Sequence, residues 1–127
     1  MLRKTIAFCL LLCTVACHAR QAPVEDAQKA AALFIQRLNA GEFEKIYDDA
    51  AKGLKDRGHD EVVKSLKEAA SKGVIREYSL ISMELPASGK QRMANPVYAA
   101  VSDSWRGNLK LKFIDEDGEW KLIGFER

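Results

Sequence analysis

The folded part of this sequence lacks cysteine. The 127 residues contain three cysteines, Cys9, Cys13 and Cys17, and none follows residue 17. A small secreted domain that is held together by disulfides needs an even set of cysteines in its folded part. No histidine or acidic residue lies between the three cysteines to complete a metal site. The sequence therefore predicts neither a disulfide scaffold nor a metal centre.

The sequence also lacks an apolar run that is long enough to span a membrane. Its uncharged leader, residues 6–15, follows Arg3 and Lys4. As a helix these ten residues would reach about 15 Å, whereas the hydrocarbon core of a bilayer is roughly 30 Å thick. A short apolar segment behind a positive start is typical of a secretion signal. We therefore expect residues 1–16 to be a signal peptide.

Small residues close the leader, and the motif "TVAC" at residues 14–17 resembles the lipobox of bacterial lipoproteins. It departs from the usual pattern at Thr14, where leucine is common. The resemblance implies cleavage before Cys17, attachment of diacylglycerol to its thiol, and acylation with fatty acids such as palmitate. Two or three acyl chains would bind the membrane far more firmly than one. We expect residues 17–22 to form the lipidated cysteine and a short tether.

This resemblance also implies a location on the periplasmic side of a bacterial membrane. His18 follows the cysteine, whereas Asp at this position retains many lipoproteins at the inner membrane. The outer membrane is therefore favoured. The alternative is ordinary cleavage after Ala16 or Ala19, which would release a soluble secreted protein.

An excess of charge of either sign is missing as well. The full sequence has 20 Lys and Arg against 18 Asp and Glu, and the leader removes two basic residues and no acidic one. A neutral mature chain argues against a nucleic-acid partner, which would require a concentrated basic face. The 111 residues from position 17 onward can form one core. We expect a single domain over residues 23–127.

Apolar residues recur at helical spacing three times before residue 73, which predicts three helices. The first begins near Pro23 and ends at residues 39–41, the second covers 42–51, and the third begins at Asp60 as its cap and closes at Gly73. The apolar stripe of the first helix comprises Ala27, Ala31, Phe34, Ile35 and Leu38.

After residue 73 the apolar pattern alternates, as it does in strands. The expected strands are 75–85, 97–106, 109–115 and 119–126, with residues 86–96 as a polar connection. Residues 107–108 and 116–117 are expected to form two-residue hairpin turns. The predicted fold class is α+β, with three N-terminal helices packed on a curved four-stranded antiparallel sheet.

The two turns define a register for the sheet. They place Arg106 opposite Leu109, and they place Lys112 between Asp103 and Lys121. One face then meets the helices. It carries Tyr98, Ala100, Leu109, Leu111, Phe113, Trp120 and Leu122.

The other face of this predicted sheet is unusually apolar. It carries Val97, Val101, Trp105, Ile114, Ile123 and Phe125. A sheet face in water should be polar, and apolar patches of this kind often mark contact surfaces. We therefore expect a homodimer or protein contact through Val101, Trp105, Ile114, Ile123 and Phe125. The alternative is that the first strand, the long connection or sheet curvature covers them.

Two segments resemble the nuclear-transport-factor-2-like (NTF2-like, or cystatin-like) superfamily. They are "FIQRLNAGEFEKIYDDAA" and "GNLKLKFIDEDGEWKLIGFE". The resemblance rests on six residues within these segments, which are Phe43, Ile46, Tyr47, Gly118, Trp120 and Leu122. The resemblance covers nearly the whole mature chain and implies a helix, a short second helix and a curved sheet.

The superfamily includes isomerase-like and dehydratase-like enzymes, which need an acid or histidine inside the cone of the sheet. Here His59 is expected to be exposed or a helix cap, Tyr98 to pack in the core, and Asp103 to form an ion pair. We therefore expect a non-enzymatic domain without cofactor or metal that binds a partner protein or small ligand. The alternatives are a small pocket enzyme of the isomerase or dehydratase type and a soluble secreted inhibitor or chaperone-like factor.

Overall fold

The computed structural model describes residues 24–88 and 91–127, so the leader, Cys17 and the tether lie outside the described residues. A helix over residues 24–40 comes first. The remaining helices are α2 (Phe43–Asp48), α3 (Lys52–Lys55) and α4 (His59–Ala70). The strands are β1 (Glu77–Glu84), β2 (Ala87–Ser88), β3 (Gln91–Val101), β4 (Arg106–Glu116) and β5 (Glu119–Glu126). Among these helices, none has the length and apolar character to cross a bilayer.

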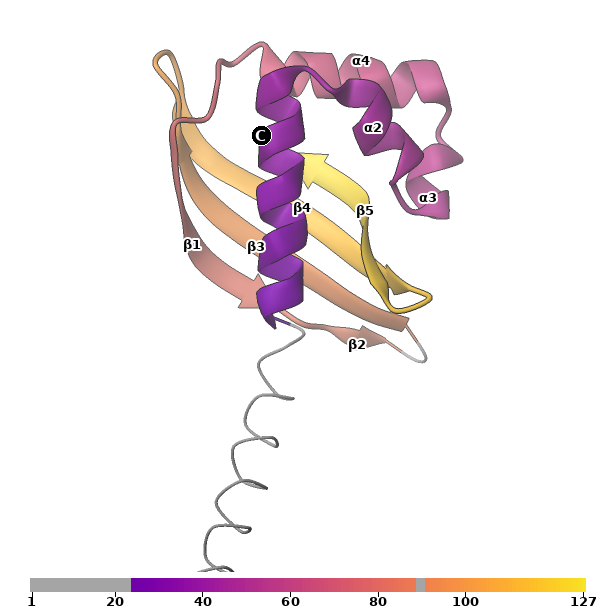
Figure 1. The fold of residues 1–127 in the computed structure, drawn as a ribbon. Coiled ribbons are helices and arrows are strands. Elements are labelled where there is room, and N and C mark those ends of the chain that lie inside the picture. The colour runs from indigo at the N-terminus through magenta and orange to yellow at the C-terminus, as the bar shows by residue number, and fades with distance from the viewer. Residues whose placement is uncertain (1–23, 89–90) are drawn as a thin grey trace, which may run out of the picture.

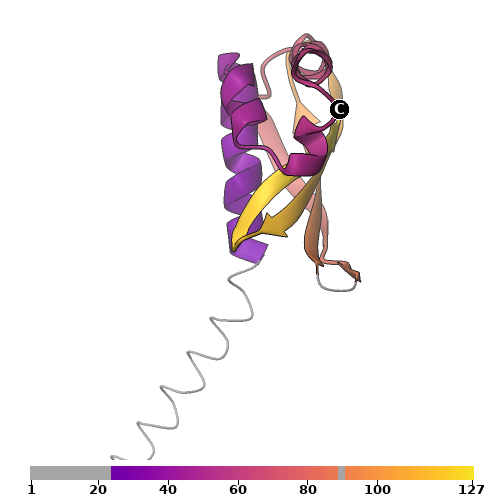
Figure 2. The same cartoon turned by 90° about the vertical axis from the view of Figure 1, so that its right-hand side faces the viewer.

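The strands form an antiparallel sheet in the order β1-β3-β4-β5, and the short β2 pairs with β3. Figure 1 shows the long helix lying across one face of this sheet and α4 running along its upper end. The view in Figure 2, along the layers, shows the long helix on one side of the sheet. The predicted α+β architecture is confirmed, and the four-residue α3 is an addition to it.

The long helix has the apolar stripe that its spacing predicts. All five stripe residues are buried, each at most 4% exposed. They pack on the inner face of the sheet, where Leu109, Leu111 and Phe113 of β4 are buried in the same core cluster. A buried helical stripe on an apolar sheet face is the main source of stability in such a two-layer domain.

The start of α4 differs from the prediction. Its N-cap residue is Gly58, and Asp60 lies inside the first turn, with no side-chain cap. An acidic side chain there still interacts favourably with the positive end of the helix. At the other end, the Arg127 guanidinium donates hydrogen bonds to the carbonyls of Ala69 (2.8 Å) and Gly73 (2.7 Å). The first bond satisfies a carbonyl that the last turn of α4 leaves without an internal partner, and the second links the C-terminal residue to the segment after the helix.

The boundaries of the second and third strands differ more. Residues 91–96, predicted to be a connection, begin β3, and residues 107–108, predicted to be a turn, belong to β4. The chain instead reverses over residues 102–105, where the Ser102 hydroxyl donates to the Lys72 carbonyl at 2.7 Å. Gly107 lies under the Trp105 ring, and a Cβ there would be 2.6 Å from the nearest ring carbon. Close packing against Trp105, and not a turn, explains why residue 107 is glycine.

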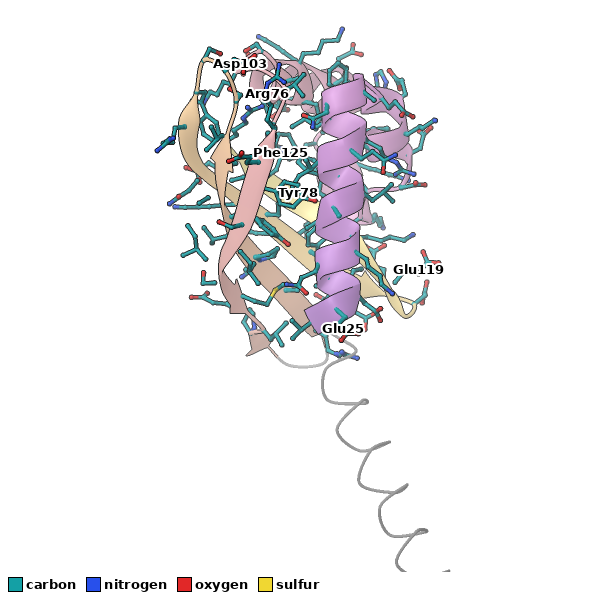
Figure 3. All side chains as sticks on the ribbon, turned by 60° about the vertical axis from the view of Figure 1, so that its left-hand side comes forward. Glu25, Arg76, Tyr78, Asp103, Glu119 and Phe125 are labelled. Carbon is teal, nitrogen blue, oxygen red and sulfur yellow. The ribbon has the colours of Figure 1, made fainter. Side chains whose placement is uncertain are left out.

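The second hairpin turn is displaced by one residue. Asp117 and Gly118 have φ values of 54° and 85°, so the turn is of the primed kind that joins two-residue hairpins. Glu116 consequently pairs with Glu119, and Lys112 lies opposite Gly124. The predicted row of Asp103, Lys112 and Lys121 is wrong, because Asp103 pairs with Arg76 at 2.7 Å (Figure 3).

The faces of β3 and β4 were nevertheless predicted correctly. The observed register differs from the predicted one by an even number of residues, so residues 97–101 and 109–114 keep their sides. Arg106 at the misplaced turn does not, because it pairs with Val101 and not with Leu109. Another exception lies in β5, where the pairing shifts between Leu122 and Gly124 and leaves Ile123 as an extra residue. This bulge places Phe125 opposite Leu111, on the inner face.

Candidate functional site

A half-open pocket with a volume of about 450 Å³ lies between the long helix, α2 and the β4–β5 hairpin. This size is in the range of small-molecule sites. Its apolar part is formed by Ala30, Leu33, Phe34, Ile46, Phe113, Trp120 and Leu122. Its polar part is formed by Asp26, Arg37, Asp48, Asp49, Glu119 and Lys121.

The long helix supplies one wall through a second stripe beside its core stripe. Asp26, Ala30, Leu33 and Arg37 follow one another at intervals of four, three and four residues, and all four line the pocket. Such intervals place side chains on one helical face. Leu33 in the middle is 43% exposed, because the pocket leaves it partly uncovered.

The β4–β5 hairpin supplies the opposite wall, and its aromatic residue, Trp120, is contacted by Arg92 of β3. The Arg92 guanidinium lies 5.6 Å from the centre of the Trp120 ring and 3.6 Å from an oxygen of Asp115. The backbone N–H of Gly118 donates to Asp115 at 2.9 Å, which fixes the turn. Figure 3 shows Glu119 at this turn, close to the long helix. The indole is therefore fixed on its strand as a rigid side of the pocket.

The end of α2 closes the pocket and carries most of its charge. Asp48 and Asp49 lie there, and Asp49 accepts a hydrogen bond from Arg37 at 2.7 Å. Four carboxylates and two basic groups line the pocket. The excess of negative charge around an apolar surface favours a ligand that joins an apolar body to a positive group.

The acidic residues of the pocket stand at its mouth. Asp26, Asp48, Asp49 and Glu119 are all exposed, whereas Phe34, Ile46, Phe113 and Leu122 are buried beneath them. A carboxylate at an exposed mouth can attract and orient a cation. Within residues 24–88 and 91–127, no group of three His, Cys, Asp or Glu side chains is arranged so that it could hold a metal ion.

The predicted lipidation site, Cys17, lies outside the described residues, and its acylation stays a prediction. The five residues predicted for a contact surface lie in different environments. Ile114 is buried, at 6% exposure, and Val101 is half-buried. Ile123 packs on α3, where a Cβ on Gly53 would lie 3.3 Å from the Ile123 Cδ1.

Trp105 and Phe125 do not form an outer apolar face with the others. The Arg127 guanidinium lies 4.6 Å from the Trp105 ring centre, and Trp105 packs against the core. The Phe125 ring centre is 5.8 Å from that of Phe34 on the long helix. Their predicted placement on the outer face is therefore wrong, and a contact through the five residues stays a prediction.

The two aromatic candidates for chemistry lie outside the pocket. His59 is exposed, as predicted, with Nε2 2.6 Å from Glu44 and Nδ1 2.9 Å from Asp60. The hydrogen bonds to Asp60 and Glu44 raise the pKa of His59. Tyr98 is buried in the core, as predicted, and burial raises its pKa.

Reasoning from the sequence missed the acidic residues of the pocket. Asp48 and Asp49 lie in the second predicted helix, over residues 42–51, and Glu119 begins a predicted strand, and neither pattern indicates a site. One signal was present, because Asp26 and Arg37 bracket Ala30 and Leu33 on a helical face beside the core stripe. The contributions of α2 and the hairpin come from distant segments and have no local pattern.

Comparisons with known proteins support the fold and give no relative by sequence. No protein-family model and no curated protein matches this chain. A Campylobacter jejuni structure, named as a candidate NTF2-like transpeptidase, matches with a TM-score of 0.59 and 11% identity over 76% of this chain and 96% of that one. A designed NTF2 chain, Rd1NTF2, matches with a TM-score of 0.56 and 14% identity over 82% of this chain and 97% of that one. The helices and the curved sheet described above therefore form an NTF2-like fold.

Proposed function

We propose that this protein is a lipid-anchored, non-enzymatic binding domain. Its pocket takes a small molecule, or a partner's side chain, that joins an apolar body to a positive charge. The observation that carries this proposal is the pairing of an apolar floor with an acidic mouth in one pocket of about 450 Å³. Apolar surface supplies affinity, and the carboxylates select the sign of the charge.

The position of the carboxylates supports binding over catalysis. A general base works best when burial or neighbouring charges move its pKa toward neutrality. Asp26, Asp48 and Glu119 are exposed to solvent instead. The Campylobacter jejuni protein is named only as a candidate transpeptidase, and similarity of fold carries no activity with it. The rival proposal, a small isomerase or dehydratase, would need a shielded acid in the pocket.

The proposal can be tested with two probes of similar size and opposite charge. Phenethylamine and phenylacetate are titrated into the protein, and the methyl NMR signals of Leu33 and Ile46 are followed. We expect phenethylamine to shift both signals at concentrations at which phenylacetate does not. Equal or stronger binding of phenylacetate would contradict the proposal.

Charge-neutral variants locate the binding within the pocket. Glu119→Gln together with Asp48→Asn should weaken phenethylamine binding about three- to tenfold, because each exposed charge contributes on the order of 0.2–1 kcal/mol. Asp56→Asn together with Glu68→Gln, two exposed carboxylates outside the pocket lining, is the matched control and should leave the affinity unchanged. An equal loss of affinity in the control would show that the net charge of the protein, and not the pocket, causes the effect.

The anchor is a separate part of the proposal. It is supported by the lipobox-like "TVAC" and by the absence of a later cysteine. Mass spectrometry of the mature N-terminus should find Cys17 as the first residue, with its thiol and amine acylated. Cys17→Ser should move the protein from the membrane fraction to the soluble extract. A native N-terminus beyond residue 17 would instead favour a secreted protein.

The proposed location is the periplasmic side of the outer membrane. It is supported by His18, which stands where a retention signal for the inner membrane would have Asp. Separation of the two membranes on a density gradient tests this, and His18→Asp should shift the protein toward the inner membrane.

A further inference from the structure

The exposed apolar side chains of this domain gather on one segment. The described residues include six large exposed apolar side chains, and five of them fall within residues 74–85. They are Val74, Tyr78, Leu80, Ile81 and Leu85. Three of these belong to β1, at the edge of the sheet. Figure 3 views the molecule from this edge, with β1 in front and Tyr78 beside the long helix.

The two edges of the sheet differ in whether other segments cover them. At the β5 edge, the backbone N–H of Ala51 donates to the Leu122 carbonyl at 2.9 Å, and α3 packs on Ile123. Among the described residues, β1 pairs only with β3, so its outer backbone groups are open. β1 also has no lysine or proline, the residues that commonly block an edge. An open edge of eight residues with exposed apolar side chains in its middle is a surface for an added strand.

The ends of β1 are acidic. Glu77 and Glu84 are its first and last residues, and both are exposed. Their partners on β3, Val101 and Asn95, are six positions apart and therefore share a face. Glu77 and Glu84 thus stand on the same side of the sheet, at the two ends of an apolar strip.

The acidic ends disfavour a second copy of this chain as the occupant. In an antiparallel pair of β1 strands that overlap over their whole length, Glu77 of each copy lies opposite Glu84 of the other. Like charges that are directly opposite destabilise a strand pair, and here the conflict occurs twice. A strand that ends in basic residues removes the conflict.

We propose that β1 binds an extended segment of another protein that carries a basic residue at each end. The pairing of β1 with β3 gives the spacing, because a bulge between Leu80 and Ser82 lets seven steps on β1 match six on its partner. The two basic residues are therefore six positions apart. The three positions between them that face Tyr78, Leu80 and Met83 are apolar.

This spacing can be tested with designed peptides. The first is an acetylated and amidated Lys-Val-Thr-Val-Thr-Val-Lys, and the second replaces both lysines with glutamate. They are titrated into the chain from residue 17 onward with Cys17→Ser, which contains the whole described core. We expect the lysine peptide to bind and to slow amide hydrogen exchange in β1. The glutamate peptide should bind at least about tenfold more weakly, since two charge pairs at the rim change sign.

A charge swap makes the test decisive. Glu77→Lys with Glu84→Lys should reverse the order, so that the glutamate peptide binds more tightly. Asp56→Lys with Glu68→Lys makes the same change of net charge away from β1 and should keep the original order. Glu119→Gln should also leave peptide binding unchanged, which separates β1 from the pocket.

Several results would overturn the proposal. They are failure of both peptides to bind, equal binding of the two, or an unchanged order after the charge swap in a variant whose circular dichroism is native. Self-association of the chain by light scattering, with protection of the β1 amides in the absence of peptide, would show that the occupant is a second copy.

Discussion

The side chain of Asn39 makes the two hydrogen bonds to Ile75 that a neighbouring strand would make with its backbone. Its Nδ2 donates to the Ile75 carbonyl at 3.0 Å, and its Oδ1 accepts from the Ile75 N–H at 2.9 Å. The pair joins the end of the long helix to the segment that leads into β1. The sequence suggested only that Asn39 lies at a helix end, because its partner is 36 residues away.

We expect Asn39→Ala to destabilise the domain by about 1–3 kcal/mol, because it leaves a half-buried N–H and carbonyl without partners. Urea unfolding followed by circular dichroism measures the change. Gln36→Ala, an exposed position on the same helix, is the control and should change the free energy of unfolding by less than about 0.5 kcal/mol. A similar loss in both variants would argue against a special role for the Asn39 pair.

At the scale of elements, the bulge in β5 shows why sequence patterns predict faces better than contacts. Strict alternation in "EWKLIGFE" places Phe125 on the face opposite Leu122. One extra residue at Ile123 moves Phe125 to the inner face. A bulge has no reliable local signature, so the sequence could not show that this ring meets Phe34.

Phe125→Ala tests this placement. We expect a loss of about 2–3 kcal/mol, less than for a fully buried phenylalanine, because the ring is only half-buried against the core. Val74→Ala, at 53% exposure, is the control and should have little effect. Thermal and urea unfolding measure both. A loss below about 0.5 kcal/mol for Phe125→Ala would place the ring on the surface after all.

The hairpin turns show the opposite failure, in which a strong local signal was misleading. Gly107 and Asn108 resemble a hairpin turn, yet both lie in β4. Ser102 and Ser104 bind the Lys72 carbonyl instead, which holds the true turn against the end of α4. This contact spans about thirty residues, and no window along the sequence contains it.

His59 joins α2 to α4 through Glu44, and this link should depend on pH. The hydrogen bonds to Asp60 and Glu44 raise the pKa of His59 from its ordinary value of 6.5. A raised pKa in the folded state means that the stabilisation is present below about pH 6.5 and is lost as the pH rises through the folded value. The wild type should therefore exceed His59→Gln in stability at about pH 5.5 and equal it at about pH 8.

Urea unfolding midpoints at the two pH values measure this difference. Glu44→Gln should reduce it, because the variant removes one of the two carboxylates that bind the imidazole. A constant difference between wild type and His59→Gln at both pH values would contradict the prediction.

At the scale of the whole molecule, the proposed anchor and the fold together define an orientation. Six residues separate Cys17 from the helix that begins at residue 24, and an extended chain of that length reaches only about 20–25 Å. Figure 1 shows the start of this helix at one end of the molecule and α4 at the other. The helix start should therefore lie near the bilayer, and α4 should lie away from it.

Spin labels at two exposed sites test this orientation. Lys29→Cys lies near the start of the long helix, and Lys67→Cys lies on α4. In acylated protein on vesicles, a relaxation agent confined to the membrane should broaden the signal of the first label more than that of the second. Equal broadening would mean that the domain lies on its side or moves freely about its tether.

The pocket was the part of the molecule that the sequence predicted least. Its walls come from the long helix, α2 and the β4–β5 hairpin, and Asp26 and Glu119 are 93 positions apart. The sequence predicted each wall as an element, but the angle of the helix on the sheet decides whether a space remains between them. That angle depends on the packing of the whole core.

Among the described residues, β1 is the one edge of the sheet that no other segment covers, and this limits how the molecule can assemble. A unit with two free edges can grow into a fibre, because each addition exposes a new site. This domain resembles a monomer with one reactive end, since α3 and Ala51 contact the β5 edge at Leu122 and Ile123. Association through β1 would therefore use up the open edge after one addition.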